Sequence, residues 1–229
     1  MSIPAPDLPV HALAHRPLTP EAVAELLALP AATELREDED ATDAELARRG
    51  WTSEGAPFDG YLWTGHGHVH CCESPYAPFG DPDGLHFLAF GEVYPVDPDD
   101  EDEGHDPGLL EMMDAWEAKT GWAGLRPATV ADCEAVLAQA AQAVTEQLGA
   151  GPERTVVSDA TVVTGPAMTH RIWRTATHAL VVGPHADNGP YGYLTHLQLS
   201  LTPLGCGPEL PPAGDEKALA QWITAHVDW

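Results

Sequence analysis

Two periodicities divide this chain into stretches with different predicted structure. Apolar residues recur at helical spacing after Thr19 and again from Thr129 to Leu148, whereas apolar and polar residues alternate over residues 58–95. A repeat of about 3.6 residues indicates an amphipathic helix, and a repeat of 2 indicates a half-buried strand. The chain therefore reads as an α+β protein.

Capping residues mark where the predicted helices begin and end. Thr19 is expected to start a helix that Pro30 stops. Thr42 and Glu45 have capping-box spacing and predict a second helix that Gly50 ends. Further helices are expected over residues 107–121, 129–149 and 215–227.

Most of the remaining chain alternates like strands. Beside residues 58–95, strands are expected at 155–163, 170–174, 178–183 and 193–201, and an irregular lead-in at 1–18. In the last strand the leucines fall on one face and His196, Gln198 and Ser200 on the other. Short connections favour antiparallel sheet with helices packed on one face.

Two stretches of the sequence resemble each other and predict an internal duplication. Residues 61–72 align without gaps with 171–182, so that Trp63 meets Trp173 and His68 meets His178; residues 84–95 align with 192–203. We therefore expect two similar helix–strands–helix halves, 19–122 and 123–229, which alternatively form one continuous domain.

Charge narrows the classes of function. The net charge is -26, and no Lys or Arg occurs between Arg49 and Lys119, a stretch with 16 acidic residues. Such a field repels nucleic acid and anionic membranes and attracts basic proteins. Solubility, salt adaptation and a biased genome composition are alternative explanations. The predicted partner-binding residues are Asp97, Asp99, Asp100, Glu101, Asp102, Glu103 and Asp106, with Asp81, Asp83 and Glu92 nearby.

Histidines cluster in the segment from His66 to Cys72. On a strand, His66, His68, His70 and Cys72 project to one face, and His86 follows on the next strand. Zn²⁺ accepts imidazole nitrogen and thiolate sulfur together, so these five residues are a candidate zinc site. The alternative is a polar strand face of surface histidines. The sequence Gly65-His66-Gly67 also suits a hairpin turn, which would remove His66 from the set.

No catalytic motif accompanies these features. The chain contains no nucleophile elbow, zincin motif, phosphate-binding loop or dinucleotide fingerprint. The cysteines lack disulfide-framework spacing and the N-terminus lacks a signal-peptide pattern, so a cytoplasmic location is expected. The leading hypothesis is a non-catalytic binding protein that docks a basic partner, as immunity proteins, inhibitors or chaperones do. The alternative is a metal-binding enzyme or sensor, and the oligomeric state is open.

Overall fold

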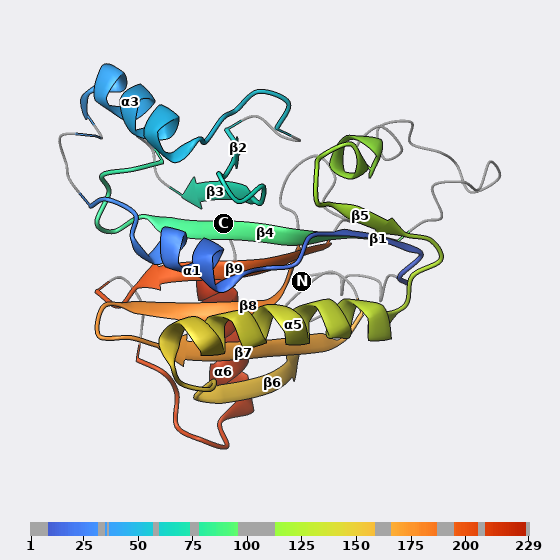
Figure 1. Ribbon diagram of the computed structural model, residues 1–229. Helices are drawn as coiled ribbons and strands as arrows, with labels where there is room; N and C mark the ends of the chain where they lie inside the picture. The colour runs from blue at the N-terminus through green and yellow to red at the C-terminus, as the bar shows by residue number, and fades with distance from the viewer. Residues whose placement is uncertain are drawn as a thin grey trace, which may run out of the picture.

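The core of the protein is one antiparallel sheet, seen in a computed structural model (Figure 1). The structure describes residues 9–31, 35, 37–56, 60–73, 78–95, 113–158, 166–186, 195–205 and 209–227. Within them the sheet has nine strands, and its main path runs β2-β3-β4-β9-β8-β7-β6. These strands are β2 (Leu62–Trp63), β3 (Val69–Glu73), β4 (Leu85–Tyr94), β6 (Arg154–Ser158), β7 (Met168–Arg174), β8 (His178–Ala186) and β9 (Thr195–Pro203). The predicted α+β class with antiparallel sheet is confirmed.

Two helices, α1 (Pro20–Leu27) and α5 (Val130–Leu148), cover one face of this sheet, which we call the α5 face. Every second residue of β9 points into this layer: Leu197, Leu199 and Leu201 are at most 2% exposed and pack with Leu137 of α5. Fully burying a leucine stabilises a fold by about 1.5–3 kcal/mol. The prediction that the leucines of this strand share one face is therefore confirmed.

The opposite face, the α6 face, is also covered by helix. Trp222 and Ile223 of α6 (Glu216–Val227) pack against Ile172 and Val181, which alternate along their strands with residues of the α5 face. Figure 1 shows α5 in front of the sheet and α6 behind it. The expectation of helices on one face is therefore wrong. Apolar positions on both faces of β7 and β8 require cover on both sides.

The caps agree with the sequence at some helix ends and differ at others. Thr129 and Asp132 form a capping box at the start of α5, and Gly149 ends it in the left-handed conformation. The helix α3 (Glu39–Arg49) ends at Gly50 as predicted, but its N-cap is Asp38. Thr42, the predicted cap, is buried within the helix. Asp38 takes the role because its carboxylate accepts from the backbone N–H of Ala41.

The predicted irregular lead-in contains a strand. Residues 12–15 form β1 (Ala12–His15), which pairs with β4 on one side and with β5 (Ala123–Leu125) on the other. Ala12, Leu13 and Ala14 are completely buried. A four-residue strand between prolines carries too little alternation to be recognised from sequence, and its position in the sheet depends on tertiary pairing.

The aligned tryptophans occupy different faces of the sheet. Trp63 pairs with Val69 and packs on the α6 face, whereas Trp173 pairs with Leu180 and packs on the α5 face. Five residues separate Trp63 from its cross-strand partner Val69, whereas six separate Trp173 from its partner Leu180. One extra residue moves every following side chain to the other face. The ungapped equivalence of Trp63 and Trp173 is therefore wrong.

Trp116 anchors the helical residues 113–117 to the α6 face. Its side chain is 1% exposed and its ring centroid lies 5.5 Å from that of Trp63 and 4.2 Å from that of Trp122. We expect Trp116→Ala to lower the free energy of unfolding by about 3–5 kcal/mol, as measured by urea denaturation. Trp116→Phe should cost clearly less, because the indole N–H has no hydrogen-bond partner in the described part of the chain. A loss below about 1 kcal/mol for Trp116→Ala would mean that this packing is wrong.

Membrane-spanning helices were also sought in the structure. Among the described residues, no helix is long and apolar enough to cross a bilayer.

Candidate functional site

The predicted histidine cluster separates into two groups, and one of them is a pair in contact. His70 Nε2 lies 3.1 Å from His86 Nδ1, and their rings stack with centroids 5.3 Å apart. Both side chains are buried, and Trp51 packs against His70. Burial lowers the pKa of His86 to about 4 and that of His70 well below its ordinary value, with the neighbouring imidazole adding to the effect at His70. Both rings are therefore neutral at pH 7.

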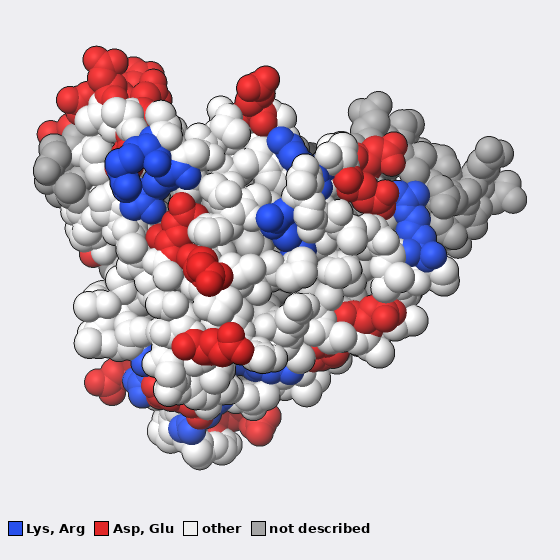
Figure 2. Space-filling model, viewed as in Figure 1, with Lys and Arg blue, Asp and Glu red and all other residues white. Residues whose placement is uncertain are grey.

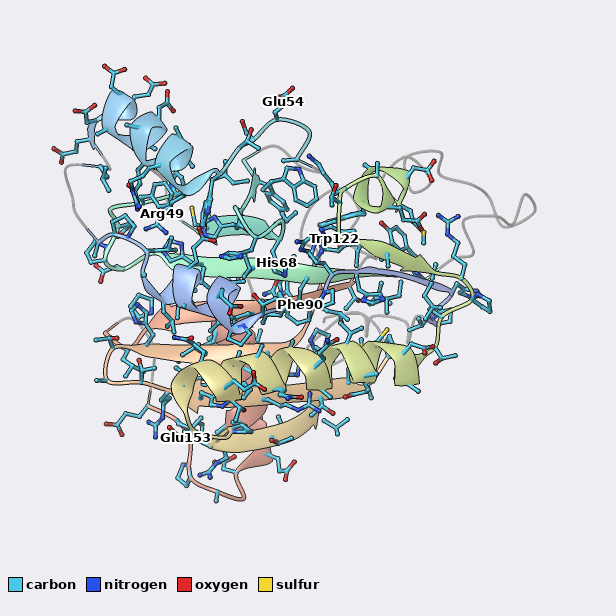
Figure 3. The ribbon with its side chains drawn as sticks, in the orientation of Figure 1. Arg49, Glu54, His68, Phe90, Trp122 and Glu153 are labelled. Carbon is cyan, nitrogen blue, oxygen red and sulfur yellow. The ribbon has the colours of Figure 1, made fainter. Side chains whose placement is uncertain are left out.

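The other two histidines point elsewhere because residues 64–68 form a turn. The N–H of Gly67 donates to the Thr64 carbonyl, as the hairpin alternative requires. His66 then extends toward Glu25, with a separation of 3.8 Å between Nε2 and the carboxylate. His68 is completely buried, and its Nε2–H donates to the carbonyl of Pro17 over 3.0 Å (Figure 3). Burial lowers the pKa of His68 to about 4.

Two of the five predicted zinc ligands are thus in contact. Cys72 lies opposite His86 in the strand register and is partly exposed. Within the described residues, no three His, Cys, Asp or Glu side chains converge where a metal ion could bind. The zinc site stays a prediction. The alternative of surface histidines is wrong for His68, His70 and His86, which lie in the interior.

A buried polar layer on the α6 face was missed by the sequence reasoning. Its centre is a row across three adjacent strands, in which Glu92 pairs with His196 and His196 pairs with His185. The carboxylate of Glu92 contacts Nδ1 of His196, and both side chains are at most 2% exposed. The whole layer, all at most 4% exposed, consists of Glu92, His170, His185, His196, Gln198, Ser200 and Thr202.

The outer members of the layer are held by specific contacts. The ring of His170 lies over Gly183, where any Cβ would collide with it, and its Nε2–H donates to the Pro184 carbonyl over 2.9 Å. Gln198 donates from Nε2 to the hydroxyl of Ser200 over 2.9 Å. These contacts fix the side chains, because buried polar groups are stable in a protein interior when they are hydrogen-bonded.

Burial sets the protonation of this layer. Desolvation lowers the pKa of His185 to about 3, with smaller contributions from His196 and His170, and lowers that of His170 to about 4. Desolvation, together with the nearby Glu92 carboxylate, raises the pKa of Tyr94 well above its ordinary value. At pH 7 the imidazoles of His170 and His185 are therefore neutral, and so is the phenol of the adjacent Tyr94.

A carboxylate that orients an imidazole is the geometry of a general base. The cavity beside His196 has a volume of about 10 Å³, room for roughly one water molecule. Burial raises the pKa of Cys71, which lines this cavity, to about 12, so its thiol is a poor nucleophile at pH 7. The cavity is lined by Tyr61, Val69, Cys71, Phe87, Ala89, Trp116, His196 and Gln198. Because most of these side chains are apolar, the geometry is that of an interior polar network beside a small apolar cavity.

The structure describes only some of the acids in the predicted acidic surface. Residues 97–106, which contain all seven predicted partner-binding acids, lie outside the described residues. Of the neighbouring acids, Asp83 is exposed, Asp81 is partly exposed and Glu92 is completely buried. Including Glu92 in the surface was wrong, because its strand is covered on both faces.

The start of helix α3 carries a group of acids that was not among the predicted partner-binding residues. Figure 2 shows a cap of Asp and Glu side chains over this helix, at the upper left of the molecule. Thr42 is the buried residue of α3 and Leu46 packs against the core, whereas the acids at the start of the helix are exposed. We name these exposed side chains the α3 acidic face: Glu37, Asp38, Glu39, Asp40 and Asp43.

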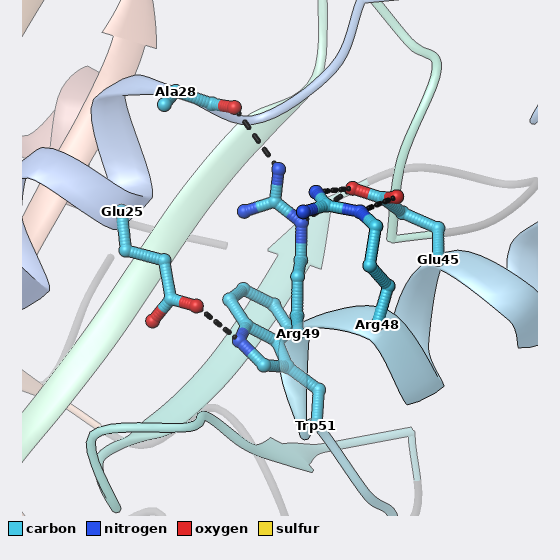
Figure 4. Close-up of polar contacts among 6 residues, drawn as sticks. All are labelled: Glu25, Ala28, Glu45, Arg48, Arg49 and Trp51. Carbon is cyan, nitrogen blue, oxygen red and sulfur yellow. Dashed lines mark hydrogen bonds and ion pairs between the residues drawn. The ribbon is translucent and has the colours of Figure 1, made fainter.

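The arginines of α3 are occupied at the base of this face (Figure 4). Arg48 and Arg49 each donate to the carboxylate of Glu45, at 2.6–2.7 Å, and Arg49 also donates to the Ala28 carbonyl. The hydrogen bond from Arg48 and the adjacent Arg49 lower the pKa of Glu45 to about 2. Trp51 donates from Nε1 to Glu25 over 2.8 Å beneath them. The positive charges of this helix therefore face its own carboxylate.

Other described cations have partners too. Arg126 lies 3.2 Å from Glu117, Arg171 lies 3.6 Å from Glu134, and Lys119 lies 4.6 Å from the ring centre of Trp63. These cations are therefore already paired and do not neutralise the other acids of the exposed surface.

The chain was also compared with protein-family models, with curated proteins and with solved structures. None of the three comparisons finds a match.

Proposed function

We propose that this protein is a non-catalytic binding protein that docks a basic protein partner, in the manner of an immunity protein, an inhibitor or a chaperone. The observation that carries the proposal is the α3 acidic face, which presents five exposed acids within residues 37–43. The arginines of the same helix are held by Glu45. A surface field of this sign attracts a basic partner and speeds its encounter.

The acidic segment of residues 97–106 belongs to the same proposal as a second docking element. It adds seven acids and no Lys or Arg to the chain. We also propose a cytoplasmic location, which is supported by the reduced thiols of Cys71 and Cys133.

We further propose that the two halves arose by duplication. The strand order supports it: β2-β3-β4 and β7-β8-β9 are both antiparallel meanders, and they meet edge to edge at the β4–β9 pairing. Each meander is preceded and followed by helical residues.

The test uses a variant with a partly neutralised α3 acidic face, Glu39→Gln, Asp40→Asn and Asp43→Asn, which keeps the Asp38 cap. A basic partner is first captured from native lysate at low salt and its binding kinetics are then measured. We expect the variant to associate about 10-fold more slowly with a nearly unchanged dissociation rate, because peripheral charges mainly steer encounter. Raising the salt concentration should slow association of the unmodified protein in the same way.

The matched control removes three exposed acids elsewhere, Glu54→Gln, Glu146→Gln and Glu209→Gln. Both triple variants change the net charge equally. Equal association rates for the two would show that only total charge matters and would remove the α3 acidic face as a docking site. Failure to capture any basic protein, or binding that is indifferent to salt, would contradict the proposed function.

A further inference from the structure

Strand β6 is an open edge of the sheet. It pairs with β7 on one side, and no described strand lies on its other side. At the opposite end of the sheet, β2 has two residues, and Trp63 exchanges both backbone hydrogen bonds with Thr52, so that edge is closed. An open edge presents backbone N–H and C=O groups that can pair with another strand.

The side chains of β6 suit strand pairing. Its sequence is RTVVS, and Val157 is 65% exposed, the larger exposure of the two exposed large apolar side chains found in the described residues. Threonine and valine favour extended backbone. Charged side chains, prolines and bulges usually protect an edge. In β6 the one charged residue, Arg154, stands at the start of the strand, and residues 155–157 contain neither a charge nor a proline.

Local charge identifies the partner. Three of the ten Lys and Arg of the chain, Arg154, Arg171 and Arg174, lie on β6 and β7. Two carboxylates lie close to these arginines: Glu134 is 3.6 Å from Arg171, and Glu153 is 2.8 Å from Arg174. Figure 2 shows acidic and basic side chains intermixed at this lower edge of the molecule, in contrast to the acidic cap over α3. This edge gives a basic partner no net attraction.

We propose that a second copy of this chain docks here and pairs β6 antiparallel with its own β6. A two-fold axis at Val156 places Thr155 opposite Val157 of the other copy and makes the interface self-complementary. The near-neutral edge lets two chains of charge -26 meet where their repulsion is smallest. The α3 acidic face lies at the other end of the molecule, so it stays open in the dimer (Figure 1). A five-residue strand pair is a small interface, and the dimer is therefore weak and concentration-dependent.

The experiment is sedimentation equilibrium of the purified full chain over a range of protein and salt concentrations. We expect a monomer–dimer equilibrium that strengthens with salt, because salt screens the repulsion between the copies. Val157→Lys should weaken it at least about 10-fold, since a lysine on an edge strand opposes pairing. The far-ultraviolet circular dichroism and melting temperature of the variant should stay unchanged, because Val157 is mostly exposed.

The matched control is Leu125→Lys on β5, which adds the same charge at another exposed apolar position, 36% exposed. It should leave the dimer intact. A monomer at every concentration and salt level overturns the proposal, as does a dimer that Leu125→Lys weakens as much as Val157→Lys, or one that salt dissociates. The sedimentation experiment contains no basic partner. Partner binding weakens with salt, whereas the dimer strengthens with it. Absence of the dimer would therefore leave the proposed function unaffected.

Discussion

The free energy of unfolding should fall steeply as the pH is lowered from 6.5 toward 4. Burial lowers the pKa of His68, His86 and His170 from 6.5 to about 4, and that of His185 to about 3. Between these values the unfolded chain binds protons that the folded chain does not, so stability is present above pH 6.5 and lost below it. Each such proton costs about 1.4 kcal/mol per pH unit, and four together cost several.

A competing effect acts at lower pH. Protonating the many carboxylates reduces the self-repulsion of a chain with a net charge of -26, which stabilises the compact state. Most carboxyl groups titrate near pH 4, so this gain comes after most of the histidine loss. We therefore expect the histidines to determine how the free energy of unfolding changes with pH between pH 6.5 and 5.

The measurement is urea denaturation at closely spaced pH values. His68→Gln is the informative variant, because its amide can still donate to the Pro17 carbonyl but does not titrate. Its slope of stability against pH should be smaller than that of the unmodified protein by about 1.4 kcal/mol per pH unit, one proton's contribution. Unchanged stability between pH 7 and 5 would show that these histidines are solvated in the folded state.

Local signals in the sequence predicted several elements. The α5 helix is capped by Thr129 and Gly149, where a capping box and a left-handed glycine satisfy the terminal backbone groups. A helix was predicted over residues 215–227, and at its start the carboxylate of Asp215 accepts from the N–H of Ala218. Such contacts lie within a few residues of the chain, so they can be recognised without knowing the fold.

The buried polar layer could not be predicted in this way. In β9 the polar positions His196, Gln198 and Ser200 alternate with leucines, a pattern that ordinarily places polar side chains in water. All nine residues of the strand are buried instead. Burial of the polar half depends on what packs on the α6 face, which is set by distant parts of the chain. A signal was nonetheless present, since Glu92 and His185 occur within largely apolar strands.

The histidine cluster shows how one turn decides a site. Strand periodicity placed His66, His68 and His70 on one face, but this holds only while the backbone is extended. Gly67 has a φ of 76°, a value that glycine adopts at little cost, and the chain turns there. His70 consequently meets His86, while His66 and His68 point to other partners.

Removing either partner of the buried Glu92–His196 pair should lower the free energy of unfolding by about 3–5 kcal/mol. His196→Leu leaves the Glu92 carboxylate, which is completely buried, without the imidazole that contacts it. Glu92→Leu deprives the imidazole of its carboxylate. The double variant should cost much less than the sum of the two, because it removes the buried carboxylate together with the imidazole that it contacts.

A double-mutant cycle in urea, performed at pH 7, measures this coupling. The matched control is Glu153 and Arg174, whose side chains are 39% and 38% exposed and 2.8 Å apart. Exposed pairs couple by about 0–1 kcal/mol, because water screens them and their long side chains lose entropy when held together. We therefore expect a coupling energy several-fold larger for the buried pair than for the surface pair. Additivity of the Glu92 and His196 substitutions to within about 0.5 kcal/mol would mean that each side chain is stabilised by other neighbours, and that the row across β4, β9 and β8 does not act as a unit.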